Sequence, residues 1–257
     1  MVYCTLMLTI LFYIYSIAIT TVFVVLSFLA LVVCWPFDKG RRVVHELSRT
    51  LCMLFWHVPP LWRRRIEGLE NVDPAKPYVI VLNHNSMVDI ISLYFVPLNF
   101  RWVSKREVFR LPFMGQLLLL HGDIAIERGR GAESMHKVAQ KGKMWLSRGV
   151  SVAIFPEGTR SKDGEIHRFK QGAFVLAKEA GVDVLPVVMN GTGDIFKGWF
   201  FFNWRHFMTV RVLPPVPAAE VVQADTAALA ESVRGRMVAA LAEIRAADGG
   251  NGQEKKG

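Results

Sequence analysis

The part of the sequence that decides the fold is Tyr78-Val79-Ile80-Val81-Leu82-Asn83-His84-Asn85-Ser86-Met87-Val88-Asp89. A run of apolar and β-branched residues follows Pro77 and leads into a polar segment. This pattern predicts a strand that is buried on both faces, as in a parallel sheet, and a loop at its end. Ser86 and Asp89 then stand in the spacing of a capping box before an apolar run, which predicts that a helix begins here.

His84 and Asp89 are the candidate catalytic pair of this loop. The predicted helix places Asp89 in its first turn and His84 just before it, so that the carboxylate can meet the imidazole. A carboxylate bound to one ring nitrogen fixes the tautomer of a histidine and makes it a better general base. The spacing alone leaves a second interpretation open, in which Asp89 only caps the helix and His84 is a polar loop residue.

The composition limits the class of protein and the nature of its partners. A chain of 257 residues suits one sizeable domain with an appendage, and its net charge of +9 requires an anionic partner. Nucleic acid, anionic lipid and a phosphorylated substrate all satisfy that requirement. Because Cys4, Cys34 and Cys52 all lie near the N-terminus, the rest of the chain has no cysteine nucleophile, disulfide framework or cysteine-ligated zinc. No metal site and no cofactor are expected.

The N-terminal segment is predicted to be a membrane anchor. Residues 1–37 carry no charged side chain, and Asp38 is the first. As a helix this segment would be roughly 50 Å long, whereas the hydrocarbon core of a bilayer is about 30 Å thick. The helix must therefore tilt, bend or leave the bilayer. A cleaved signal peptide is the competing interpretation, but a basic first region is absent and the apolar stretch is too long.

A second helix and a group of cations follow the anchor. Lys39, Arg41 and Arg42 place this end on the cytoplasmic side by the positive-inside rule. The amphipathic pattern over 42–56 predicts a helix with His45 off its apolar stripe. That stripe comprises Val43, Val44, Leu47, Leu51, Leu54 and Phe55. The basic triplet 63–65, with Trp56 and Trp62, is expected at lipid headgroups. Both a crossing and a helical hairpin within one leaflet remain open.

After Pro59-Pro60 the sequence alternates between strand and helix patterns, which predicts an α/β fold with a largely parallel central sheet flanked by helices. Strands are expected near 78–82, 100–104, 122–126, 150–155, 182–188 and 208–213, and helices near 87–96, 111–120, 131–147, 172–180 and 226–246. The predicted organisation is a membrane anchor over 1–62, a catalytic domain over 63–216, a C-terminal helix over 217–247 and a disordered tail over 248–257.

Cations follow the predicted strand 100–104. Lys105 and Arg106 begin at the sheet edge where His84 is expected, because the carboxyl ends of parallel strands share one edge. Both side chains could bind a phosphate group there. The alternative is a solvated loop before a helix that starts near Pro112.

A second candidate phosphate site follows strand 150–155, in the turn Glu157-Gly158-Thr159-Arg160. Gly158 allows a tight turn with backbone close to a ligand, and Arg160 can hold two phosphate oxygens at once. The alternative is an ion pair between Glu157 and Arg160 that only holds the turn. Further along, Pro186 interrupts the predicted strand 182–188, which predicts an edge position or a bulge.

Four stretches over residues 83–188 follow one another in the order NHNSMVD, KREVFRLPFMG, IFPEGTRS and VDVLPVV. This order resembles the four sequence blocks of the glycerolipid acyltransferase family, and within it most closely the 1-acylglycerol-3-phosphate O-acyltransferases. The segment GDIAIER, from Gly122 to Arg128, also fits the short strand ending in Arg of that family. The joint match covers about half of the chain and is far more specific than the spacing of His84 and Asp89 alone.

The resemblance assigns a role to each candidate residue. It implies that His84 takes the proton from the free hydroxyl of an acceptor and that Asp89 orients it. It also implies that Glu157, Gly158, Thr159 and Arg160 bind the glycerol phosphate, with Lys105 as a second cation. The expected reaction is transfer of an acyl group from a coenzyme A or acyl carrier protein thioester to lysophosphatidic acid at the cytoplasmic face of a membrane. Backbone N–H groups after Asn85 are candidate donors to the reaction's oxyanion.

Other functions remain to be separated from this one. The same family includes acyltransferases for other lyso-lipids and for glycerol 3-phosphate itself. A basic membrane-associated binding protein without activity is a second class, disfavoured by the complete His84 and Asp89 pair. A nucleic-acid binder is a third, disfavoured because the chain has no recognisable recognition helix or RNA-binding motif.

Overall fold

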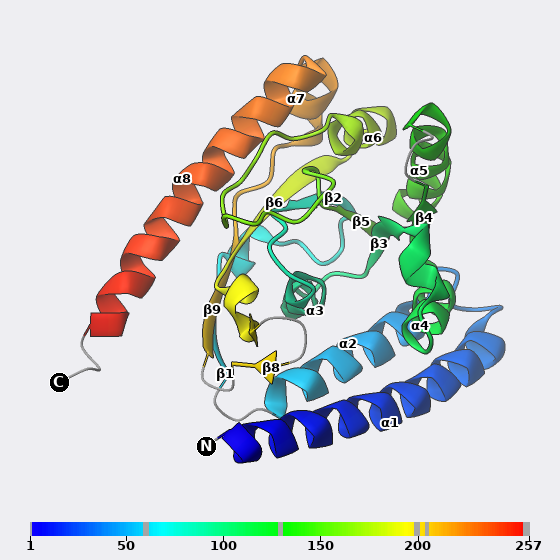
Figure 1. The fold of residues 1–257 in the computed structure, drawn as a ribbon. Coiled ribbons are helices and arrows are strands. Elements are labelled where there is room, and N and C mark those ends of the chain that lie inside the picture. The colour runs from blue at the N-terminus through cyan, green and yellow to red at the C-terminus, as the bar shows by residue number, and fades with distance from the viewer. Residues whose placement is uncertain (1, 59–61, 128–130, 198–200, 204–205, 254–257) are drawn as a thin grey trace.

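The computed structural model describes residues 2–58, 62–127, 131–197, 201–203 and 206–253 (Figure 1). A seven-stranded sheet forms the centre of the protein, in the order β1-β9-β6-β2-β5-β3-β4. Its strands are β1 (Trp62–Glu67), β2 (Tyr78–Leu82), β3 (Phe100–Lys105), β4 (Ile124–Ile126), β5 (Ser151–Ile154), β6 (Asp183–Asn190) and β9 (His206–Val212). Neighbouring strands are parallel apart from β6 and β9, which are antiparallel. Strands β7 (Phe196–Lys197) and β8 (Phe201–Phe202) form a separate hairpin.

Helices cover both faces of the sheet, as the predicted α/β fold requires (Figure 1). One face packs against α5 (Gly131–Leu146), α6 (Gly172–Ala180), α7 (Ala218–Gln223) and α8 (Thr226–Gln253). The other packs against α1 (Val2–Cys34), α2 (Arg42–His57) and α3 (Val88–Ser92), while α4 (Met114–His121) contacts α1 and α2. Short 3-10 turns lie at Leu69–Asn71 (η1), Leu93–Phe95 (η2), Arg106–Arg110 (η3) and Thr192–Ile195 (η4).

Strand β2 is buried on both faces, as its sequence predicted. Val79 and Val81 pack into the core beneath α5 to α8, and Tyr78, Ile80 and Leu82 pack into the core on the opposite side. Alternate residues of a strand point to opposite faces, so a strand with helices on both sides is apolar throughout. The loop that follows β2 consequently leaves the sheet at a fixed position.

The predicted strands and helices are present with small shifts of their ends, whereas α7 and the hairpin of β7 and β8 were missed. Strand β1 was missed as well. Arg63, Arg64 and Arg65 of β1 belong to an edge strand paired with β9, and their expected position at lipid headgroups stays a prediction. The Arg65 side chain forms ion pairs with Glu67 at 2.8 Å and with Asp248 at 2.7 Å. Edge strands, which have no neighbouring strand along one side, often carry charged side chains. The sequence of β1 therefore lacks the hydrophobic pattern by which a strand is predicted.

Pro186 does not lie on an edge strand, so that part of its prediction was wrong. Strand β6 lies between β9 and β2, and Pro186 is opposite Val81 in the parallel register. The registered antiparallel pairing with β9 begins at the next residue, Val187. Pro186 therefore lies at the end of the ladder between β6 and β9. Fewer backbone hydrogen bonds would need an N–H at this position, which proline lacks.

The disordered tail expected from Asp248 was also wrong for residues 248–253, because α8 continues to Gln253. The Asp248 carboxylate accepts hydrogen bonds from Arg65 at 2.7 Å and from the Asn190 side chain at 2.9 Å. These contacts hold α8 against β1 and β6. The helix therefore extends into a part of the sequence whose composition does not favour a helix. Residues 254–257, Pro59-Pro60 and Arg128 lie outside the described residues.

Within the described chain, α1 contains a segment long and apolar enough to cross a membrane, Leu6–Cys34, with a mean hydropathy of 2.8. The helix lies lengthwise along α2 and reaches α4 (Figure 1). Near its start, the Phe12 ring contacts the rings of Phe202, Trp62 and Phe55, with centroids 4.9, 6.2 and 6.5 Å apart. The apolar segment is thus attached to the body of the protein along one side, while its other side is exposed.

The buried face of α2 differs from the predicted stripe. His45 is buried and Val43 is exposed, whereas the opposite was expected. The reason is a second packing partner: α2 lies between α1 and the sheet, so residues off the predicted stripe are covered as well. The His45 ring contacts the rings of Tyr94 and Phe100, at 5.3 and 4.8 Å between centroids.

His45 belongs to a buried polar network at the amino edge of the sheet. Its Nδ1 lies 3.0 Å from Nε2 of His121, which also accepts a hydrogen bond from Arg101 at 3.1 Å. The Nδ1–H of His121 donates to Asp123 at 2.8 Å. Arg101 also donates to the carbonyl oxygen of Gly40 at 2.6 Å, which ties the connection between α1 and α2 to β3.

We expect this network to make stability depend on pH. Burial lowers the pKa of His45 and His121 well below the usual value, and the positive charge of Arg101 lowers both pKa values further. As the pH falls below about 6.5, the unfolded chain therefore binds up to two more protons at these residues than the folded protein does. Burial also raises the pKa of Asp123 to about 7, which adds one proton to the folded state. The net excess of about one proton in the unfolded chain means that these groups lower stability as the pH falls from 6.5 to 5.

The measurement is the free energy of unfolding in detergent between pH 5 and 6.5. For the variant His121→Gln, we expect the slope to fall by about 1 kcal/mol per pH unit, because one of the two titrating imidazoles is gone. The variant His136→Gln, at an exposed position on α5, should keep the slope of the unaltered protein. Equal slopes in the unaltered protein and the His121 variant would contradict this explanation.

Candidate active site

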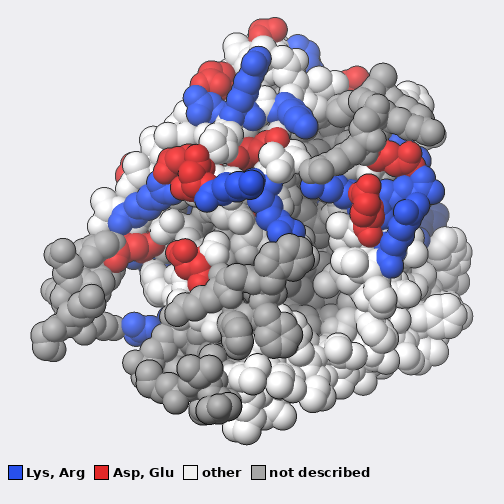
Figure 2. Space-filling model, viewed as in Figure 1, with Lys and Arg blue, Asp and Glu red and all other residues white. Residues whose placement is uncertain are grey.

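The predicted site residues gather around one pocket beyond the carboxyl ends of β2, β3 and β5. Its volume is about 560 Å³, and its lining includes residues from all three loops. The lining residues that the sequence singled out are His84, Lys105, Gly158, Thr159 and Arg160. Strands β2 and β3 both pair with β5, so three loops far apart in the sequence meet at one edge. Figure 2 shows Lys and Arg side chains gathered across the middle of one face, above the uncharged part of the surface formed by α1.

His84 and Asp89 form the predicted pair. The Nδ1 of His84 lies 2.9 Å from Oδ2 of Asp89, and the same oxygen accepts the N–H of Asn85 at 2.6 Å and of Ser86 at 2.8 Å. The Asp89 side chain is 0% exposed and that of His84 is 14% exposed. The hydrogen bond from the Ser86 N–H to the Asp89 carboxylate is the one that the capping-box spacing predicted.

The surroundings of Asp89 decide which nitrogen of His84 is available. Because Oδ2 already accepts two backbone N–H groups, the carboxylate acts as an acceptor and Nδ1 of His84 must donate to it. In the neutral ring Nε2 is then the atom with a free lone pair. His84 thus lines the pocket in the tautomer that can accept a proton from a bound hydroxyl group.

The ring of His84 is held from a second direction by Phe155. The two rings are stacked, with centroids 3.9 Å apart and planes inclined by 17°. Phe155 stacks in turn on Trp102, with centroids 5.1 Å apart. The imidazole is therefore fixed by a carboxylate at its edge and by an aromatic column against its face.

The cationic side of the pocket comes from β3 and from the turn after β5. Lys105, Arg160 and Lys162 all line it, together with the backbone of Gly158. Gly158 has φ of +74°, a conformation that glycine adopts without strain, and this allows the turn to fold back toward His84. Arg106 contributes less directly, because it pairs with Glu127. The geometry favours an anionic group bound beside the imidazole.

Glu157 lies beneath the turn and is 6% exposed. Its Oε1 accepts the backbone N–H of His84 at 3.0 Å, and its Oε2 accepts the backbone N–H of His167 at 3.2 Å. Burial raises the pKa of Glu157, while the two N–H groups oppose that shift. The sequence grouped Glu157 with the phosphate-binding residues, but the structure directs both of its oxygens to backbone groups.

Two of the oxyanion donors expected at the start of α3 already have an acceptor, so the prediction was wrong for the N–H groups of Ser86 and Val88. It stays a prediction for the N–H of Met87, which lines the pocket. The N–H of Ser86 donates to Asp89, and the N–H of Val88 donates to the Ser86 hydroxyl at 3.3 Å. A polar side chain that caps a helix satisfies the same N–H groups that an oxyanion would need.

Comparison with known proteins places the chain in a family. A family profile described as Acyltransferase matches residues 63–190. The 1-acyl-sn-glycerol-3-phosphate acyltransferase alpha of Ovis aries is 35% identical over 236 residues, which are 90% of this chain and 80% of the relative. The Homo sapiens protein of the same name is 34% identical, over 90% of this chain and 81% of its own length. The chain belongs to the 1-acyl-sn-glycerol-3-phosphate acyltransferase family.

A solved structure shows that this acyltransferase shares its fold with a bacterial relative. The crystal structure of the 1-acyl-sn-glycerophosphate (LPA) acyltransferase, PlsC, from Thermotoga maritima matches with a TM-score of 0.77 and 22% identity. The match covers 95% of this chain and 97% of the Thermotoga chain, so it includes α1 and α2 as well as the sheet. The expected fold class and family are both confirmed.

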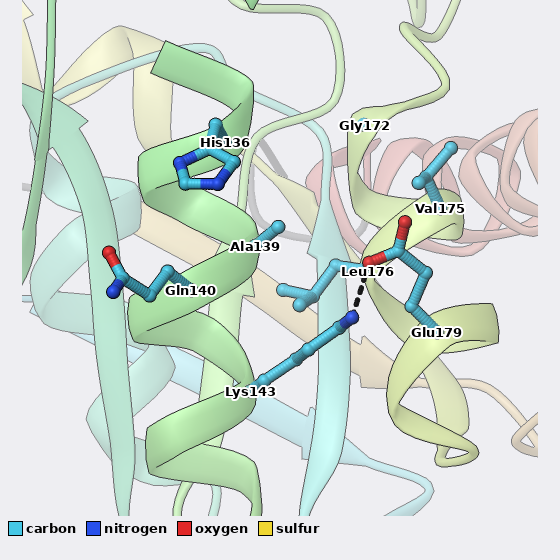
Figure 3. Close-up of a pocket in the computed structure, with 8 residues that line it drawn as sticks. All are labelled: His136, Ala139, Gln140, Lys143, Gly172, Val175, Leu176 and Glu179. Carbon is cyan, nitrogen blue, oxygen red and sulfur yellow. Dashed lines mark ion pairs between the residues drawn. The ribbon is translucent and has the colours of Figure 1, made fainter. Parts of the chain in front are cut away.

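The acyltransferase has a second hollow on its surface, between α5 and α6 (Figure 3). Its volume is about 330 Å³, and an ion pair of 2.6 Å between Lys143 and Glu179 lies across it. In the described part of the chain it shares no lining residue with the pocket of His84. The residues that the sequence singled out for the chemistry therefore do not line this second hollow.

Sequence reasoning missed two features of the candidate active site. It took Phe155 only as the end of a strand, and it did not predict the hydrogen bond from His84 to Glu157. The alternation of side chains along β5 could have indicated which face Phe155 occupies. The bond to Glu157 has no local signal, because the two residues are 73 positions apart.

Proposed function

We propose that this protein transfers an acyl group from an acyl thioester to the free sn-2 hydroxyl of 1-acylglycerol 3-phosphate, giving phosphatidic acid. The observation that carries the proposal is the shared pocket of His84, with Nε2 free to accept a proton, and the cations Lys105 and Arg160. A phosphate bound by these cations would hold the acceptor hydroxyl near the base. Placing the two groups together makes the attack effectively intramolecular.

The chemistry requires one base and no enzyme nucleophile. As the acceptor oxygen attacks the thioester carbonyl, Nε2 of His84 takes the hydroxyl proton and Asp89 stabilises the imidazolium ion. The carbon–sulfur bond then breaks, and the thiol group leaves with the proton that His84 received. A thiolate is a good leaving group, since its pKa is about 8–9, so no further acid is needed.

The acyl donor is proposed to be a thioester of coenzyme A or of acyl carrier protein, both of which are anionic. Lys105, Arg160 and Lys162 give the pocket a basic face, which supports an anionic donor that arrives from the aqueous side. The assay described below distinguishes the two, because only the donor in use supports transfer.

The membrane side of the protein is proposed to be the exposed side of α1. Since α1 packs lengthwise on α2, we infer that it lies within one leaflet. From Lys39, Arg41 and Arg42, which follow the apolar segment, we infer that the pocket faces the cytoplasm. A lipid acceptor held at headgroup level would then reach the basic face directly. Protease added to sealed, inside-out membrane vesicles should digest the catalytic domain; protection of that domain would contradict the proposed orientation.

The proposed function is tested with a radiolabelled acyl-transfer assay on the purified protein in lipid vesicles. The acceptors are 1-acylglycerol 3-phosphate, a lysophosphatidylcholine and glycerol 3-phosphate, each with both donors. We expect transfer to 1-acylglycerol 3-phosphate to be the fastest. A higher kcat/KM for lysophosphatidylcholine or glycerol 3-phosphate would show that the proposed acceptor is wrong.

Arg160→Ala should mainly raise the KM for the phosphorylated acceptor. Loss of one charge-assisted contact corresponds to about 2 kcal/mol, or a rise of about 30-fold, while kcat changes little because the base is unaltered. The matched control is Arg236→Ala, on α8, whose side chain donates to the carbonyl oxygen of Pro214. An unchanged KM in the Arg160 variant would show that the phosphate of the acceptor binds at another part of the surface.

A further inference from the structure

We propose that Glu157 is a positioning residue for His84 and does not bind the acceptor. The inference rests on the proposed function, in which His84 accepts the proton. It explains how the turn after β5 holds His84 in position. It begins from one contact between distant parts of the chain, the 3.0 Å hydrogen bond from the His84 N–H to Oε1 of Glu157.

The backbone of His84 is held on both sides by the segment that carries Arg160. Its N–H donates to Glu157, and its carbonyl oxygen accepts the N–H of Ser161 at 2.7 Å. Asp89 and Phe155 fix the ring of His84 relative to its own backbone. The two backbone bonds then fix that backbone relative to the turn. The distance between the base and the phosphate-binding side chain is therefore set by this junction.

The geometry of Glu157 does not suit a phosphate ligand. Both of its oxygens already accept backbone N–H groups, from His84 and from His167. A carboxylate placed beside a phosphate would also repel it, since like charges disfavour each other at close range. Within the described residues, the lining of the pocket includes Gly158, Thr159 and Arg160 but not Glu157.

The turn itself is held by contacts that do not use the Glu157 carboxylate. The N–H of Gly158 donates to the carbonyl oxygen of Phe155 at 3.1 Å, and the N–H of Lys170 donates to that of Pro156 at 2.9 Å. Removal of the carboxylate should therefore leave Arg160 close to its place. It leaves the N–H groups of His84 and His167 without their acceptor. Since only His84 carries the proposed base, the main effect should fall on kcat.

The test compares Glu157→Ala and Glu157→Gln with a matched control, Glu165→Gln. Glu165 is an exposed residue of the same loop and pairs with Arg245 at 2.6 Å. We expect Glu157→Ala to lower kcat by about 30- to 100-fold, the order of effect that a misplacement of about 1 Å has on a catalytic group. The KM for the phosphorylated acceptor should change by less than threefold. Glu157→Gln should restore part of kcat, because the amide oxygen can still accept one of the two N–H groups.

A rise in KM with kcat unchanged, in either Glu157 variant, would overturn the inference and make Glu157 an acceptor contact. If Glu157→Ala does not fold, Glu157→Gln decides alone, and a kcat equal to that of the unaltered enzyme would also overturn it. All constants are measured with whichever phosphorylated acceptor the unaltered enzyme uses. If the proposed acceptor is wrong, the unaltered enzyme will prefer another acceptor. If the proposed role of Glu157 is wrong, only the kcat and KM of the Glu157 variants will differ from the expected values.

Discussion

His84→Ala is expected to lower kcat by about 10²- to 10⁴-fold, which is the usual contribution of a general base. The substitution removes Nε2, the lone pair that receives the acceptor proton. It should leave the fold intact, because the backbone N–H and carbonyl of His84 keep their bonds to Glu157 and Ser161. Membrane association should also be unchanged, since α1 lies on a different part of the protein from the pocket.

The measurement is steady-state acyl transfer by the variant in lipid vesicles, with thermal unfolding to show that the protein is folded. His136→Ala, at an exposed position on α5, is the matched control and should keep the full rate. A near-normal rate in the His84 variant would remove the proposed base. A loss of rate in both variants would point to damage unrelated to the pair.

The catalytic pair could be predicted because its information is local. His84 and Asp89 are five residues apart, and their contact follows from a strand end and the first turn of a helix. To predict that His84 and Asp89 lie near Lys105 and Arg160, one further rule was needed: the carboxyl ends of parallel strands lie at one edge of the sheet. This rule places residues on an edge but does not give the order of the strands along it.

Contacts that depend on strand order could not be predicted. Glu157 reaches His84 because β5 lies beside β2, although α3, β3, α4, β4 and α5 come between them in the chain. The burial of His45 likewise depends on a sheet and a helix that cover α2 from two sides. Periodicity in a sequence shows which residues share a face, but it does not show how many faces are covered.

Asp89→Asn is expected to lower kcat by about 10³-fold, with little change in KM because Asp89 is fully buried behind the base. The asparagine oxygen can still accept the N–H groups of Asn85 and Ser86, so the loop should keep its shape. What is lost is the negative charge that stabilises the imidazolium ion formed when His84 takes the proton. The variant Asp73→Asn, in an exposed turn where the carboxylate accepts the N–H of Ala75, is the matched control.

The double variant His84→Ala, Asp89→Asn tests whether the carboxylate acts through the imidazole. If it does, the double variant should be no slower than His84→Ala alone, because groups that act as one unit have strongly non-additive effects. A further large loss of kcat in the double variant would show that Asp89 contributes by another route, such as holding the N–H groups of Asn85 and Ser86 in place. The comparison of four rates therefore separates orientation of the base from support of the loop.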